Sequence, residues 1–192
     1  LGGKRGDYKP VHPNDHVNMA QSTNDVIPTS IRLGAVTELP AFTKAFENLI
    51  GAFETKGKEF DGVMKSGRTH LQDAMPIRLG QELTAYAGSL RRSLKRVVEA
   101  ADYLRDLGIG GSAVGTGVNV EPAYPAIMVR ELAKSAGVEL REGKDRIQLM
   151  QSMGDAASFS AQMRVLALDM SKIASDLRIL ASGPRTGLDE IK

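Results

Sequence analysis

The stretch LGQELTAYAGSLRRSLKRVVEAADYLRDL, from Leu79 to Leu107, decides the fold class of this sequence. Its apolar residues recur at steps of three and four, as on one face of an α-helix. They are Leu83, Tyr86, Leu90, Leu94, Val97, Ala101 and Leu104. A helix over this stretch is about 43 Å long, whereas a compact globule of this chain length is only about 40 Å across. We therefore predict an all-α fold, an elongated bundle of long helices.

Two further long helices are expected on either side. The first begins near Asp25 and carries an apolar face that ends at Phe53, with Pro40 bending it. The last ends at Ala181 and has the heptad spacing of a helix that packs along another long helix. The residues of this seam are Met163, Leu166, Met170, Ile173, Leu177 and Leu180. Such stripes exceed what the chain itself can cover, so oligomerisation is expected.

The connecting segments are expected to lack strands. Pro76 should open the helix that contains Leu79 to Leu107, since proline is accepted in a first turn. The segment GIGGSAVGTGVN, residues 108–119, should be a turn or loop, because it contains five Gly. Its glycine spacing is not that of a phosphate-binding P-loop, so we interpret it as a tight connection between helices. A shorter helix should follow from Pro122 to Ala136, with Gly137 as its C-terminal stop.

Bulk composition excludes several classes of function. The 192 residues suit a single domain, and a net charge of +2 gives no basic surface for nucleic acid or for an anionic membrane. There is no Cys and there are only three His, which argues against disulfides and a transition-metal site. No apolar run approaches the roughly 20 residues of a membrane span. We expect a cytoplasmic protein without metal or cofactor.

Three polar clusters are candidates for chemistry. Ser22, Thr23 and Asn24 precede a helix, where hydroxyls, an amide and the helix dipole suit a bound carboxylate. The same residue types are also ordinary helix N-caps, and that alternative stays open.

The second cluster is Thr69-His70, after Gly67-Arg68 in a predicted loop. His70 is suited to proton exchange or to donation toward an anion, although a lone loop histidine is more often only hydrogen-bonded. The third cluster is His12, Asn14 and Asp15, for which a capped turn around Pro13 is the alternative.

Four ordered segments give the sequence a family resemblance: HPNDHVNMAQSTNDVIPT, SGRTHLQDAMPIRLGQE, GGSAVGTGVN and MSKIASDLRILASGPRTGLDEI. Together they make the chain resemble the fumarase/aspartase superfamily over most of its length. The resemblance implies a central domain of long helices that associates into a homotetramer, with each active site shared between three subunits. It implies that residues 1–192 are a single helical domain, with the N-terminal domain and the C-terminal catalytic loop absent.

The resemblance also assigns roles to the three clusters. Ser22 and Thr23 would bind a carboxylate of a small dicarboxylate substrate, and Asn24 would contact the group on the other carbon. Thr69 and the catalytic His70 would reach the same site from a different subunit. His12, Asn14 and Asp15 match a secondary dicarboxylate site of the family, although Lys9 stands where many fumarases have Arg.

The implied activity is reversible formation of fumarate by elimination. The run DHVN and the MSKI helix look more like aspartases, which predicts release of ammonia from L-aspartate. The alternative is a class II fumarase, which forms fumarate and water from L-malate. A second alternative is a non-catalytic, oligomerising bundle core. Residues 1–192 have no Gly-Ser-Ser-x-x-Pro-x-Lys-x-Asn loop, which carries the family's basic Ser, so alone they should be inactive.

Overall fold

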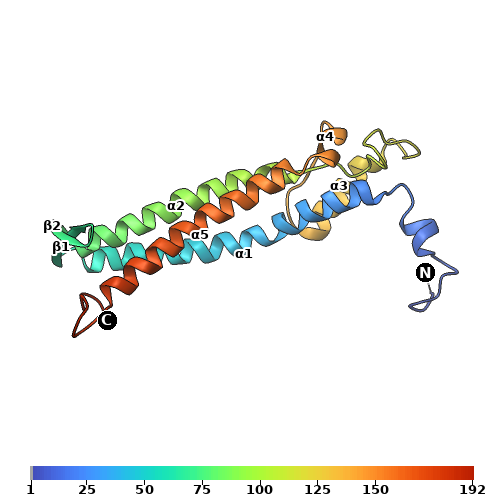
Figure 1. The fold of residues 1–192 in the computed structure, drawn as a ribbon. Helices are drawn as coiled ribbons and strands as arrows, with labels where there is room; N and C mark the ends of the chain where they lie inside the picture. Colours follow the sequence, from blue (N-terminus) through green and yellow to red (C-terminus); the bar gives the residue numbers. More distant parts are fainter. Residues whose placement is uncertain (1) are drawn as a thin grey trace. The chain divides into compact units, whose positions relative to one another are not determined.

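The computed structural model describes residues 2–192, and most of them are helical (Figure 1). The helices are α1 (Thr23–Glu59), α2 (Leu79–Asp102), α3 (Tyr124–Ala136), α4 (Arg146–Gln151) and α5 (Gly154–Leu180), with a π-helical turn at Pro13–Val17 and a 3-10 turn at Tyr103–Arg105. The strands are β1 (Met64–Thr69), β2 (Gln72–Arg78), β3 (Asp106–Leu107) and β4 (Arg141–Glu142). In the described residues each sheet has two strands, so the all-α class is confirmed.

The chain divides into two compact units. Unit 1 comprises Leu1–Glu38 and Ala101–Ala157, and unit 2 comprises Leu39–Ala100 and Ser158–Lys192. Helices α1, α2 and α5 each contribute residues to both units.

In unit 2, α2 packs against the parts of both α1 and α5 that belong to this unit (Figure 1). The guanidinium of Arg91 on α2 donates to Glu54 on α1 at 2.6 Å, and the ring of Tyr86 meets that of Phe53 edge-on. On the other side the hydroxyls of Tyr86 and Ser93 donate to Asp176 and Asp169 on α5. Gly57 on α1 lies beside Gly80, whereas Glu54 meets Arg91, so residue numbers fall along α1 as they rise along α2. They also fall along α5, from Asp176 beside Tyr86 to Asp169 beside Ser93, so α2 is antiparallel to both helices.

The apolar stripe of α2 forms the core of unit 2. Leu90 and Val97 are fully buried, and Leu83 and Leu94 are less than a tenth exposed. The seam of α5 is buried at every second position only: Leu166, Ile173 and Leu180. Met170, by contrast, is 39% exposed. Half of the predicted seam thus packs within the unit, while the remaining positions are more exposed.

The expectation that no strand precedes α2 was wrong. β1 and β2 form an antiparallel hairpin in which Pro76 pairs with Ser66 in the ladder, and the helix begins only at Leu79. The register shifts after Gly67, so Ala74 is the extra residue of a bulge on β2. A Cβ on Gly67 would lie 2.7 Å from the carbonyl oxygen of Met75, so only glycine fits this close approach.

The predicted end of the same helix was also wrong. Helix α2 stops at Asp102 and not at Leu107; a 3-10 turn follows, and Asp106 and Leu107 form β3, which pairs in parallel with β4. The apolar spacing continues through Leu104 because the 3-10 turn keeps Leu104 on nearly the same face as the apolar residues of α2.

Unit 1 is built around the first turns of α1, the glycine-rich loop and helices α3 and α4. Its core includes Val36, Leu104, Leu107 and Val129, all at most 6% exposed. The loop of residues 108–119 is irregular, as predicted, and Gly115 has φ +94 with no space for a Cβ beside Ile147. Helix α3 ends on Gly137 in the left-handed conformation, as predicted.

Arg32 is an unusual member of this core because its charge is fully buried. One guanidinium nitrogen donates to the carbonyl of Tyr103 at 3.0 Å, and another contacts the Asp155 carboxylate at 2.7 Å. Of the helices that the structure describes, none combines the length and the apolar character needed to cross a bilayer.

Candidate functional site

The first candidate cluster lies at the N-terminus of α1. Ser22 immediately precedes the helix, and its hydroxyl oxygen accepts the backbone N–H of Asn24 at 3.2 Å. Thr23 and Asn24 are the first two helical residues, and both are exposed. Ser22 is therefore an N-cap, and the capping interpretation of this segment is confirmed for it. The side chains of Thr23 and Asn24 remain accessible beside the positive end of a 37-residue helix.

Asp25, which the sequence interpretation did not single out, holds this helix end in place. Its side chain is fully buried. One carboxylate oxygen accepts the backbone N–H of Ser22 at 2.9 Å, and the other accepts those of Gly110 and Ser112 at 3.1 and 3.0 Å. The first contact completes a capping box, so the spacing Ser-x-x-Asp was the signal in the sequence. The other two tie the glycine-rich loop to α1.

Asn24 makes a second link to the same loop. Its side-chain amide donates to the carbonyl of Ala113 at 2.8 Å, which leaves the amide oxygen as an acceptor. Beside it is a cavity of about 440 Å³, lined by Asn24, Ala113, Val114, Ile147, Met150 and Gln151. Asn24 is thus fixed at the wall of a cavity in unit 1.

Charge at this helix end limits how an anion can bind. Asp25 already brings one negative charge to the helix N-terminus, and three backbone N–H groups are committed to it. Burial, and after it the Asp25 carboxylate, raises the pKa of the nearby phenol of Tyr124. A substrate carboxylate would therefore depend on the donors of Ser22 and Thr23 more than on the helix dipole.

The second candidate cluster lies at the tip of the β1–β2 hairpin. Thr69 pairs with Gln72, so His70 and Leu71 form a two-residue turn. Both have positive φ, +52 and +61, which is the type I′ geometry usually made by Asn and Gly. His70 and Leu71 are exposed. The turn holds an imidazole in a strained, outward position, a feature that clusters at functional sites.

Charged groups fix the base of this hairpin. Lys65 on β1 is only 8% exposed and lies between Glu82 of α2, at 3.0 Å, and Glu190, at 3.1 Å. Arg68 on the same strand contacts Glu190 at 2.5 Å. The Arg68 guanidinium lowers the pKa of Glu190 below its usual 4.5; burial opposes this, and Lys65 reinforces it. No sequence motif marks this cluster, because Glu190 is more than 120 residues from Arg68.

The third cluster, His12 with Asn14 and Asp15, lies on the π-helical turn. The Nδ1 atom of His12 accepts the backbone N–H of Asp15 at 3.1 Å, and its own backbone N–H donates to His16. The amide of Asn18 contacts Asn14 at 3.4 Å. Local capping accounts for these contacts, and binding of a second dicarboxylate here stays a prediction.

The clusters fall in different units: Ser22 to Asn24 in unit 1, and Thr69 with His70 in unit 2. Across residues 2–192 there is no group of three or more His, Asp or Glu side chains arranged to hold a metal ion.

Comparison with known proteins places the chain in a family. A family model described as "Lyase" matches residues 1–192. The chain is 46% identical over 191 residues to the aspartate ammonia-lyase of Bacillus subtilis, covering all of this chain and 40% of that protein. It is 41% identical over 192 residues to the class II fumarate hydratase of Helicobacter pylori, covering all of this chain and 42% of that protein.

A solved structure agrees with these relatives. The crystal structure titled fumarate lyase:delta crystallin from Brucella melitensis, bound to cobalt, superposes with a TM-score of 0.92 at 46% identity. The match covers 98% of this chain and 41% of that one, so the chain spans about two fifths of the length of the proteins it matches. The chain belongs to the lyase family that contains the fumarases and the aspartases.

Proposed function

We propose that the protein to which these residues belong is a lyase that forms fumarate from L-aspartate with release of ammonia. The observation that carries the proposal is the 46% identity, over the whole chain, to the aspartate ammonia-lyase of Bacillus subtilis. The class II fumarate hydratase of Helicobacter pylori is 41% identical, which keeps conversion of L-malate as the second candidate.

The chemistry fits the groups at the two candidate clusters. Elimination removes a proton from the carbon next to a carboxylate, and the electron pair is held on that carboxylate until the C–N bond breaks and ammonia leaves. Donors that strengthen as this charge develops lower the barrier. In the proposal Ser22 and Thr23 donate to the carboxylate, while Asn24 and His70 face the departing group. Thr69 adds a hydroxyl beside His70.

Assembly is part of the proposal. Residues 1–192 form the central helical domain, and four copies associate so that Ser22 to Asn24 of one subunit meet Thr69 and His70 of another. The exposure of Met170, Val165 and Leu168 on α5 supports this, since these apolar side chains would be covered by a neighbouring subunit. A cytoplasmic location is proposed with it.

The first test is turnover by the full-length protein. We expect ultraviolet absorbance of fumarate to appear with L-aspartate and not with L-malate. The reverse result would assign the fumarase activity, and no fumarate from either substrate would leave a non-catalytic helical core. Residues 1–192 alone should give none, because they lack the basic Ser of the family loop.

The second test addresses the shared site. Thr23→Val removes the hydroxyl and keeps the shape, so it should reduce turnover about a hundredfold or more. Thr23→Ser, which retains a hydroxyl, is the matched control. His70→Asn should also reduce turnover. Mixed oligomers of Thr23→Val and His70→Asn should regain activity, because some sites then receive both intact residues. No recovery on mixing would refute the shared site.

A further inference from the structure

The hairpin that carries Thr69 and His70 is attached to the rest of unit 2 by ion pairs of Lys65 and Arg68 on β1 and of Arg78 at the end of β2, which meets Asp61 at 3.0 Å. Its tip is exposed, and its turn is strained at both residues. The hairpin is therefore held in position at its base. There the side chains of Lys65 and Arg68, both on β1, contact the carboxylates of Glu82 on α2 and of Glu190 after α5.

Glu190 is the residue common to both cations. One of its oxygens contacts Arg68 Nη2 at 2.5 Å and the other contacts Lys65 Nζ at 3.1 Å. All three side chains are less than a fifth exposed. Ion pairs screened this little are stronger and better defined than pairs in water.

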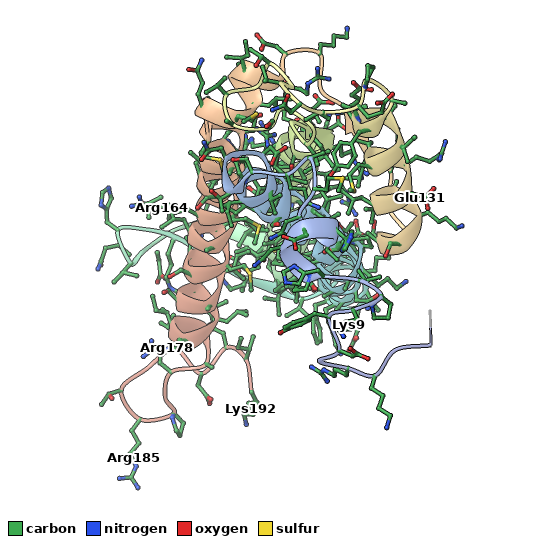
Figure 2. All side chains as sticks on the ribbon, turned by 90° about the vertical axis from the view of Figure 1, so that its right-hand side faces the viewer. Lys9, Glu131, Arg164, Arg178, Arg185 and Lys192 are labelled. Atoms are coloured by element: carbon green, nitrogen blue, oxygen red, sulfur yellow. The ribbon has the colours of Figure 1, made fainter. Side chains whose placement is uncertain are left out.

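Glu190 is itself held by the end of α5. The chain leaves the helix, passes Arg185 at the tip of a loop and returns to Lys192 (Figure 2). The backbone N–H of Glu190 then donates to the carbonyl of Leu180 at 2.9 Å, and that of Asp189 donates to Ser182 at 2.6 Å. The carboxylate is thus a fixed point on α5 and not the end of a free tail.

We propose that Glu190 is a positioning residue, which locks the β1–β2 hairpin through Arg68 and Lys65 and thereby sets where Thr69 and His70 stand. Resting on the proposed function, this assigns a role in turnover to a residue that need not touch the substrate. Arg68 directly precedes Thr69, so a shift of its guanidinium is transmitted through one residue of strand.

The balance of charge explains why this position needs a carboxylate. Lys65 and Arg68 supply two positive charges, and the partly buried Glu82 and Glu190 supply two negative charges, while the exposed Asp73 is a third carboxylate, 3.6 Å from Arg68. In Glu190→Gln Lys65 keeps Glu82, but Arg68 keeps only the long contact to the exposed Asp73. The half-buried guanidinium then loses its close counter-charge, and the hairpin base is expected to move so that water can solvate it. Glu190→Asp keeps the charge, with a carboxylate one carbon further from β1.

The test uses full-length protein and two readouts. The first is hydrogen exchange of the peptide spanning residues 64–78, which needs no turnover. The second is steady-state kinetics. Glu54→Gln is the matched control, because Glu54 also pairs with an arginine of unit 2, at 2.6 Å from Arg91, and this pair joins α1 to α2 without a residue of β1 or β2.

We expect Glu190→Gln to speed exchange in the hairpin at least tenfold and to reduce kcat about tenfold to a hundredfold, since misplacement by about 1 Å costs this much. KM should change less than kcat, Glu190→Asp should restore part of kcat, and Glu54→Gln should match the wild type. Unchanged hairpin exchange in Glu190→Gln, or kcat within twofold of the wild type, would overturn the proposal. A wild type that forms no fumarate refutes the proposed function, while hairpin exchange still decides whether Glu190 orders the hairpin.

Discussion

Replacement of Asp25 by asparagine tests how the helix N-terminus and the glycine-rich loop are joined. The wild-type carboxylate accepts three backbone N–H groups and has no exposed surface. An asparagine keeps the shape but has only one acceptor oxygen. If that oxygen faces Gly110 and Ser112, the new NH2 group meets the N–H of Ser22, donor against donor. Losing one bond to a charged acceptor costs about 2 kcal/mol.

The assay is hydrogen exchange of individual backbone amides. A loss of about 2 kcal/mol corresponds to roughly 30-fold faster exchange through local opening. We expect this at Ser22 if the oxygen stays with the loop, or at Gly110 and Ser112 if the side chain turns over. Asp145→Asn is the control, since Asp145 caps α4 while exposed, and asparagine caps equally well. Unchanged exchange at all three amides would refute the role given to Asp25.

Three other predictions concern unit 2. Leu90→Ala, at a fully buried position of α2, should lower the free energy of unfolding by about 2–5 kcal/mol in urea titrations. Leu71→Asn should raise the melting temperature by about 2–4 °C, because asparagine tolerates φ +61 and Leu71 is 70% exposed. The lowered pKa of Glu190 adds stability above pH 4.5 that is lost as pH falls through the folded-state pKa. The difference in unfolding free energy between wild type and Glu190→Gln should therefore shrink below pH 4.5; a constant difference down to pH 3 would contradict the ion pair.

The long helices were predictable because their apolar periods are long and unbroken. The stripe from Leu83 to Val97 repeats many times, so errors at single positions do not matter, and the residues that it named are buried. Helix ends depend on one or two local contacts and were less well predicted. The proline before α2 suggested that the helix starts there. Pro76 instead lies in β2, where it pairs with Ser66 of β1 across the hairpin.

The hairpin escaped prediction for a local reason. Neither MKSGRT nor QDAMPIR alternates apolar and polar residues. The half-buried positions of β1 include the charged Lys65 and Arg68, and nearly all of β2 is exposed, so no apolar face marks this sheet. Its turn is His70-Leu71, which lacks the Asn-Gly or Asp-Gly pair that marks a type I′ turn. The hairpin therefore forms although the local sequence does not favour strands or a type I′ turn.

At the candidate site, the exposed groups were predictable and their supports were not. Ser22, Thr23, Asn24 and His70 carry recognisable chemistry in a short motif. Arg68 and Glu190 resemble ordinary surface charges until the fold brings them together from 122 positions apart. An ion pair between residues so far apart in the chain produces no periodic pattern in a single sequence.

The strain at the hairpin tip and the charges at its base are two parts of one arrangement. Left-handed backbone at His70 and Leu71 costs roughly 1–2 kcal/mol for each residue. A short two-stranded ladder exposed to water is at best marginally stable by itself and cannot offset that cost. The pairing of Lys65 with Glu82 and of Arg68 with Glu190 offers the further stabilisation that this turn requires.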